Sequence, residues 1–119
     1  MLEGIIALLA QDEELTDIFG QGFLYPVRST LTGPCIVYEY YTLSASESVQ
    51  TARLQLTVIC TNLGDCRRTE AALKRLLLTF GDRPIGNITK SILTGGGQLY
   101  DEVRQMHHTL LYFTLTGKE

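Results

Sequence analysis

Tryptophan is absent from the sequence, and proline and cysteine occur only three times each. Long hydrophobic runs are also missing, because the apolar runs at residues 76–78 and 110–113 are far shorter than the roughly 18 residues that a membrane-spanning helix needs. A secretory signal would place a basic residue ahead of the first apolar stretch, and Met1-Leu2-Glu3 has none. We therefore expect a cytosolic protein with no membrane partner.

Positive charge is in the minority, because ten basic residues stand against thirteen acidic ones and the net charge is −3. A domain that binds nucleic acid by neutralising phosphates carries the opposite sign of charge, so no nucleic-acid specificity is expected. The cysteines Cys35, Cys60 and Cys66 cannot all pair within one chain, and a reducing cytosol disfavours disulfides. We therefore expect three free thiols.

The sequence does contain enough apolar surface for one folded unit. It has 119 residues, within the usual size of an independent domain, of which 45% are apolar and 19% are charged. Disordered chains are less apolar and more highly charged. We therefore expect residues 1–119 to form a single domain.

The N-terminal segment has the spacing of an amphipathic helix. Apolar residues at i, i+3, i+4 and i+7 predict one apolar stripe, which consists of Leu2, Ile5, Ile6 and Leu9. Acidic residues at positions 12–14 and Gly20 then bound a second, short helical piece. The break between the two is expected near Gln11 and Asp12.

A longer amphipathic helix is predicted from about Cys66 to Phe80. Asp65 is the expected N-cap, and Gly81 lies just past the expected end. On the opposite side from the apolar stripe, Glu70 and Lys74 have the favourable i, i+4 order of an ion pair. This side of the helix is expected to be solvated.

Strand patterns occupy most of the remaining chain. Residues 35–43 are rich in β-branched and aromatic side chains, and residues 54–60 alternate between apolar and polar ones. Two final strands are predicted over residues 85–93 and 103–115, joined by a turn at Thr94-Gly95-Gly96-Gly97. The order of elements predicts an α+β fold, in which two amphipathic helices pack on one face of an antiparallel four- to five-stranded sheet.

Catalytic and metal-binding patterns are weak. Cys66 precedes two arginines at a helix start, where a thiol pKa can fall, but a catalytic base for it cannot be identified from spacing. His107 and His108 are neighbours on a predicted strand, so they point to opposite faces and cannot bind one metal together. We expect no enzymatic activity, no cofactor and no metal, and a site at Cys66 stays open as the minor alternative.

The distribution of charge is more informative. Residues 1–20 hold five acidic and no basic residues, whereas residues 53–90 hold seven basic and three acidic ones. If the two regions lie on different flanks, neighbouring copies could meet head to tail through Arg67, Arg68 and Arg75. The alternative is that both regions are ordinary solvated surfaces.

The polar segment Ser44 to Thr51 is predicted to be a hairpin loop. Its eight residues exceed the roughly 2–5 that a tight hairpin uses, and long loops in compact domains often carry function. Glu47 and Val49 are the side chains that we expect to anchor a partner. The alternative is a solvated loop with no partner.

The full pattern resembles the tail-completion proteins of long-tailed phages, also called tail terminators or tail-to-head joining proteins. The similar segments are an amphipathic start (LEGIIALLAQDEELTDIFG), an aromatic-proline segment (FLYPV), a tyrosine-rich strand after Pro34 (PCIVYEYY), an alternating strand (RLQLTVICT) and a later helix (RRTEAALKRLLLTF). A glycine-containing hairpin and a long final strand extend the resemblance over nearly all of the chain.

This resemblance implies a virion assembly protein with no catalytic residues. Such proteins form a ring, typically a hexamer, that caps the tail tube and contacts the head connector. The implied partners are other copies of the chain, the tail tube protein and the head connector protein, and the implied location is the virion tail, after assembly in the bacterial cytoplasm. The alternatives are another neck component, such as a head-completion protein, or a small oligomeric α+β enzyme or ligand-binding domain.

Overall fold

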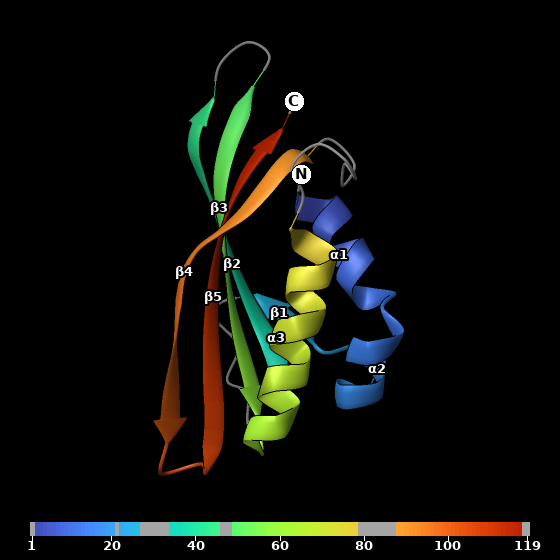
Figure 1. Ribbon diagram of the computed structural model, residues 1–119, viewed down its shortest axis with the longest axis vertical. Helices are drawn as coiled ribbons and strands as arrows, with labels where there is room; N and C mark the ends of the chain where they lie inside the picture. The colour runs from blue at the N-terminus through green and yellow to red at the C-terminus, as the bar shows by residue number, and fades with distance from the viewer. Residues whose placement is uncertain (1, 21, 27–33, 46–48, 79–87, 118–119) are drawn as a thin grey trace.

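The chain folds into one sheet with all of its helices on one side, as the computed structural model in Figure 1 shows for residues 2–20, 22–26, 34–45, 49–78 and 88–117. The elements in chain order are α1 (Leu2–Ala10), α2 (Glu13–Phe19), β1 (Leu24–Pro26), β2 (Cys35–Ala45), β3 (Gln50–Cys60), α3 (Leu63–Leu77), β4 (Ile88–Asp101) and β5 (Met106–Gly117). The strand order is β1-β2-β3-β5-β4. β1 pairs with β2 in parallel and every other pair is antiparallel, so the predicted α+β class is confirmed.

The predicted break in the N-terminal region separates two helices, so three helices rather than two cover the sheet. Asp12 is the N-cap of α2, and its carboxylate accepts a hydrogen bond from the backbone N–H of Leu15 at 3.1 Å. Gly20 ends α2 with a φ of 80° and donates its N–H to the carbonyl of Thr16. A cap at one end and a left-handed glycine at the other limit this helix to two turns.

Both predicted ends of the long helix are wrong. α3 begins at Leu63, because Asn62 is the N-cap and its side-chain oxygen accepts from the N–H of Asp65 at 2.8 Å. Asn is as good an N-cap as Asp, so the earlier of the two polar residues starts the helix. The helix ends at Leu77, and Leu78 is already extended, while the predicted last residue, Phe80, lies outside the described residues.

The core forms where the apolar face of the sheet meets the helices. The alternation predicted for residues 54–60 is confirmed, because every second residue of β3 from Ala52 to Cys60 is buried. The largest fully buried side chains come from all three helices and four of the strands: Ile5, Leu9, Leu15, Ile36, Leu54, Leu56, Val58, Leu73, Leu77, Ile88, Phe113 and Leu115. Burying each such side chain contributes about 1.5–3 kcal/mol, so this interface dominates the stability of the fold.

Half of the polar segment Ser44 to Thr51 belongs to the strands β2 and β3, which corrects the prediction of an eight-residue loop. Ser44 pairs with Thr51 and Ala45 pairs with Gln50, so only residues 46–49 connect the two strands. Backbone pairing does not require apolar side chains, and for that reason the polar composition was misleading. The resulting hairpin extends beyond the helical layer in Figure 1.

The glycine triplet is also not a turn. β4 runs through Gly95, Gly96 and Gly97 without a break, and the turn to β5 lies at residues 102–105 instead. The carboxylate of Asp101 accepts from the backbone N–H groups of Val103 and Arg104, which stabilises that turn. The glycines permit a close approach of the strands, because a Cβ on Gly96 would lie 2.5 Å from the carbonyl oxygen of Leu110.

This contact predicts unequal costs for two neighbouring substitutions. Gly96→Ala should destabilise the protein by about 1–3 kcal/mol, because the β4 and β5 backbones must move apart. Gly97→Ala is the matched control, since its Cβ would meet no atom within 4 Å; its cost should stay within about 0.5 kcal/mol. Urea unfolding curves measure both values, and equal destabilisation of the two variants would contradict the close-approach explanation.

Candidate functional site

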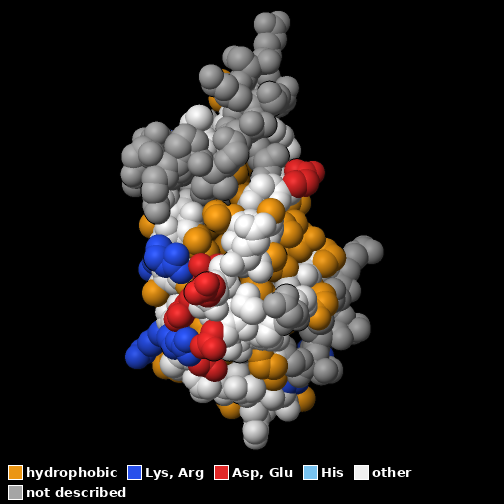
Figure 2. Space-filling model, turned by 90° about the vertical axis from the view of Figure 1, so that its right-hand side faces the viewer, with side chains coloured by type: hydrophobic (Ala, Val, Ile, Leu, Met, Phe, Trp, Pro, Cys, Tyr) orange, Lys and Arg blue, Asp and Glu red, His pale blue; other side chains and the backbone are white. Residues whose placement is uncertain are grey.

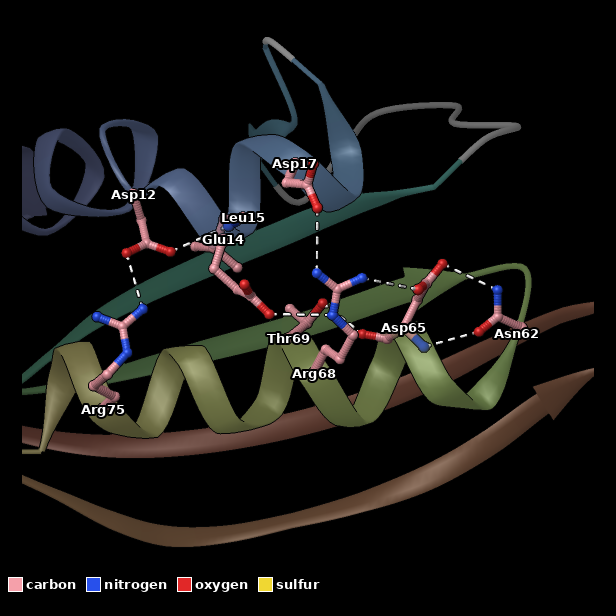
Figure 3. A network of polar contacts seen from close by, with 9 residues as sticks. All are labelled: Asp12, Glu14, Leu15, Asp17, Asn62, Asp65, Arg68, Thr69 and Arg75. Atoms are coloured by element: carbon pink, nitrogen blue, oxygen red, sulfur yellow. Dashed lines mark hydrogen bonds and ion pairs between the residues drawn. The ribbon is translucent and has the colours of Figure 1, made fainter.

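Two of the three predicted interface arginines, Arg68 and Arg75, lie at the junction of α2 and α3, where acidic and basic side chains meet (Figure 3). The Arg68 guanidinium donates to the carboxylates of Glu14 at 3.1 Å and Asp17 at 3.3 Å. The Arg75 guanidinium lies 3.0 Å from the carboxylate of Asp12. These ion pairs join residues that are more than fifty positions apart in the sequence.

Local structure positions each partner of this junction. Asp12 is held as the N-cap of α2, so one carboxylate oxygen accepts from Leu15 and the other binds Arg75. Arg68 also lies 3.8 Å from Asp65, one turn earlier on α3. Hydrogen bonds to Glu14 and Asp17 raise the pKa of Arg68, so this guanidinium stays charged.

The acidic N-terminal region therefore faces part of the basic region, namely Arg68 and Arg75 of α3, within one chain. This arrangement contradicts the premise that the two regions lie on different flanks, because Arg68 and Arg75 are neutralised by the acidic N-terminal region. Figure 2 shows the same relation on the helical side of the molecule, where Lys and Arg side chains are adjacent to Asp and Glu side chains. The physical reason is that α2 and α3 pack side by side on the sheet.

The other predicted contact residues are separate from this junction. Arg67 is exposed on α3 and is not part of the ion pairs that join α3 to α2. Val49 is exposed in the connection between β2 and β3. The ends of β2 and β3 that this connection joins lie at the opposite end of the molecule from the start of α3 (Figure 1). Glu47 lies outside the described residues. The structure thus does not bring the predicted contacts together, and a contact role for Arg67 and Val49 stays a prediction.

Apart from Val49, sequence reasoning missed the surface residues that carry exposed apolar side chains. In the described part of the chain, the exposed large hydrophobic side chains all belong to the two hairpins, β2–β3 and β4–β5, and they are Tyr41, Leu43, Val49, Leu93, Leu99, Tyr100 and Val103. The available signal was the apolar content of both faces of the predicted strands. This apolar content could not be assigned to the core or to the surface, because the pairing of the strands and the face of the sheet that the helices cover were unknown from the sequence.

The cysteines are buried and have the features of core residues. The Cys66 thiol donates to the carbonyl of His107 at 3.5 Å, inside the core cluster. Burial raises the pKa of Cys60, and the neighbouring Cys66 thiol raises it further. Burial also raises the pKa of Cys35. Cys66, the residue of the catalytic alternative, is itself only 1% exposed, and reactive cysteines are usually accessible to solvent, which weakens that alternative.

The histidines lie near one end of the sheet. The ring of His107 packs against the ring of Tyr100 with centroids 4.8 Å apart, and both histidines line a shallow depression with Leu63, Gln98, Leu99 and Thr109. Over the residues that the structure describes, no group of three or more His, Cys, Asp or Glu side chains could hold a metal ion.

None of the helices in the described part of the chain has the length and apolar character required to cross a bilayer.

The architecture places the chain in a class of small α+β folds with one mostly antiparallel sheet and helices on one face. Within this class, it is similar to a chain in the structure of the virion of a native gene transfer agent (GTA) particle. The TM-score is 0.71, the sequence identity is 14%, and the match covers 97% of this chain and 92% of that chain. At this identity the comparison shows a shared fold. The sequence matches no model of a known protein family, and no curated protein is similar to it at the level of sequence.

The double role of Asp12 predicts a graded loss of stability. Asp12→Asn keeps an N-cap acceptor and loses the ion pair with Arg75, so it should cost about 0.2–1 kcal/mol. Asp12→Ala loses both interactions and should cost a further ~0.5–2 kcal/mol. Urea unfolding at low and high salt separates the two contributions, because salt screens only the ion pair. Equal losses in the two variants would exclude the capping role.

The buried thiols predict a fall in stability at alkaline pH. Unfolded cysteines ionise at about pH 8.5, whereas the raised pKa values keep Cys35 and Cys60 protonated in the folded state. The unfolded state then binds fewer protons, and stability should fall by up to ~1.4 kcal/mol per pH unit for each thiol above this pH.

The measurement is the slope of the unfolding free energy between pH 8 and 10. A Cys35→Ala/Cys60→Ala double variant serves as the comparison, because it lacks both thiols. Its slope should be shallower, whatever its absolute stability. An identical slope in the two proteins would show that the thiols are not the titrating groups.

Proposed function

We propose that this chain is a structural component of a phage-like virion. The observation that supports it most is the fold similarity to a chain of a gene transfer agent virion, which extends over almost the full length of both chains. Similarity over whole chains is more informative than a shared motif, because insertions and deletions that remodel a surface are few. The role proposed is assembly, without an enzymatic activity.

Within the virion, we propose the finer role of tail completion. In this role, copies of the chain form a ring, with six subunits as in the tail-completion proteins that the sequence resembles, at the head-proximal end of the tail tube. The ring stops tube growth and provides the surface that joins the tail to the head. Exposed apolar side chains on both hairpins support an assembly role, because such side chains are commonly covered by partner subunits.

The experiment is to locate the protein in particles from a strain that produces them. An epitope tag at the C-terminus, followed by immunogold electron microscopy, should label the junction between head and tail. Deletion of the gene should give filled heads separate from tails, and the tails should be longer than normal because polymerisation is not stopped.

Three outcomes discriminate among the roles. Labelling at the junction with tails of normal length would favour another neck component, such as a head-completion protein. Labelling elsewhere on the particle would exclude tail completion and keep the virion role. Absence of the protein from purified particles would overturn the virion proposal as a whole.

A further inference from the structure

β4 presents a long strand edge. β4 is the outermost strand at one margin of the sheet, and it spans fourteen residues. Its only strand partner among the described residues is β5. The outer backbone groups of an edge strand can pair with another chain, and proteins commonly prevent this with lysine or proline. β4 contains no proline and a single lysine, Lys90, whereas Leu93 is 37% exposed.

β2 presents a second edge on the opposite margin of the sheet. β1 covers only Ile36 to Tyr38 of β2, so the outer edge from Glu39 to Ala45 has no strand partner in the described part of the chain. This half of β2 also carries exposed apolar side chains, namely Tyr41 and Leu43, which is 56% exposed. Both margins therefore combine unpaired backbone with apolar side chains.

The register of the sheet makes these two edges complementary. Tyr41 is level with Ile92 across the sheet, through the pairs Tyr41–Arg53, Arg53–Thr114 and Thr114–Ile92. The free half of β2 therefore lies at the same height as the first half of β4.

The directions of the two strands also fit. β2 and β5 run one way, and β3 and β4 run the other way. When a second copy is placed beside the first in the same orientation, its β2 is antiparallel to β4 of the first copy. This is the more favourable of the two pairing modes.

We propose that copies of this chain join head to tail by pairing the outer edge of β4 with the free edge of β2, residues 39–45, in the next copy. The contact is heterologous, because different surfaces meet, and each added copy leaves one edge of each kind exposed. Repetition with a constant rotation closes a ring with one continuous sheet. This inference rests on the proposed ring and identifies the strands that build it.

The test introduces one lysine into each edge. Leu43→Lys blocks β2, and Leu93→Lys blocks β4, because a charged side chain at the contact disfavours strand pairing. Val103→Lys is the matched control, since Val103 is 94% exposed, lies in the β4–β5 turn and makes the same change of charge. Tyr41→Lys and Thr94→Lys are second variants of the two edges, and circular dichroism verifies that each protein is folded.

Sedimentation velocity of the purified proteins measures the result. The wild type and Val103→Lys should form the same oligomer, and each edge variant should be a monomer, with its apparent dissociation constant raised at least tenfold. An equal mixture of Leu43→Lys and Leu93→Lys should give dimers and nothing larger. The Leu43→Lys protein keeps an intact β4 edge, and the Leu93→Lys protein keeps an intact β2 edge. These two edges can pair once, and the edges left exposed on the dimer are both blocked.

Several results would overturn the proposal. One is a wild type that stays monomeric at roughly millimolar concentration. Another is that the edge variants assemble like the wild type. The third is a loss of assembly in Leu93→Lys alone, which would indicate a symmetric β4–β4 dimer. These outcomes are independent of particle location. A protein found at the head–tail junction whose edge variants still assemble would keep the proposed function and exclude this contact.

Discussion

The packing of α3 against the central strands β3 and β5 holds the two layers of the molecule together. Leu73 and Leu77 of α3 belong to the same buried cluster as Leu56 of β3 and Phe113 of β5. Once this interface forms, α1 and α2 can bury Leu9 and Leu15 only on the part of the apolar face that α3 leaves uncovered. The position of the acidic N-terminal region beside the basic side of α3 follows from that restriction.

The charged junction adds orientation more than stability. Its side chains are mostly exposed, and exposed ion pairs contribute little because water and salt screen them. Asp12 is the exception, because it is only 10% exposed and also caps α2. A network of this kind selects one register of α2 along α3, since a shift of one turn would separate Arg68 from Asp17 and Arg75 from Asp12.

The surface features that support the proposed assembly are on the sheet rather than on the helices. Arg68 and Arg75 of α3 pair with acidic residues of the same chain, whereas β2 and β4 have edges without a strand partner among the described residues and carry the exposed Leu43 and Leu93. The glycine segment of β4 belongs to this picture, because Gly96 lets β4 lie close to β5. An arrangement with two different open edges suits a repeating assembly better than a solitary subunit.

The sequence alone determined the local elements, because these depend on periodicity and capping over a few residues. The helix spacing of Leu2, Ile5 and Leu9, the glycine that ends α2 and the alternation along β3 were all interpretable without the structure. From them the α+β class followed. The start of α3 was wrong by one turn, because Asn62 and Asp65 are both good caps and only the folded helix shows which is used.

Tertiary structure decided everything that depends on which residues meet across the chain. The glycine triplet was predicted to be a turn from its composition, but it lies within β4 because Tyr112 and the carbonyl of Leu110 approach it from β5. The polar ends of the β2–β3 hairpin are paired because the register of the strands extends through them. Likewise, net charge by segment could not show that Arg68 and Arg75 bind acids of their own chain, since those partners are more than fifty residues away and are brought close only by the core.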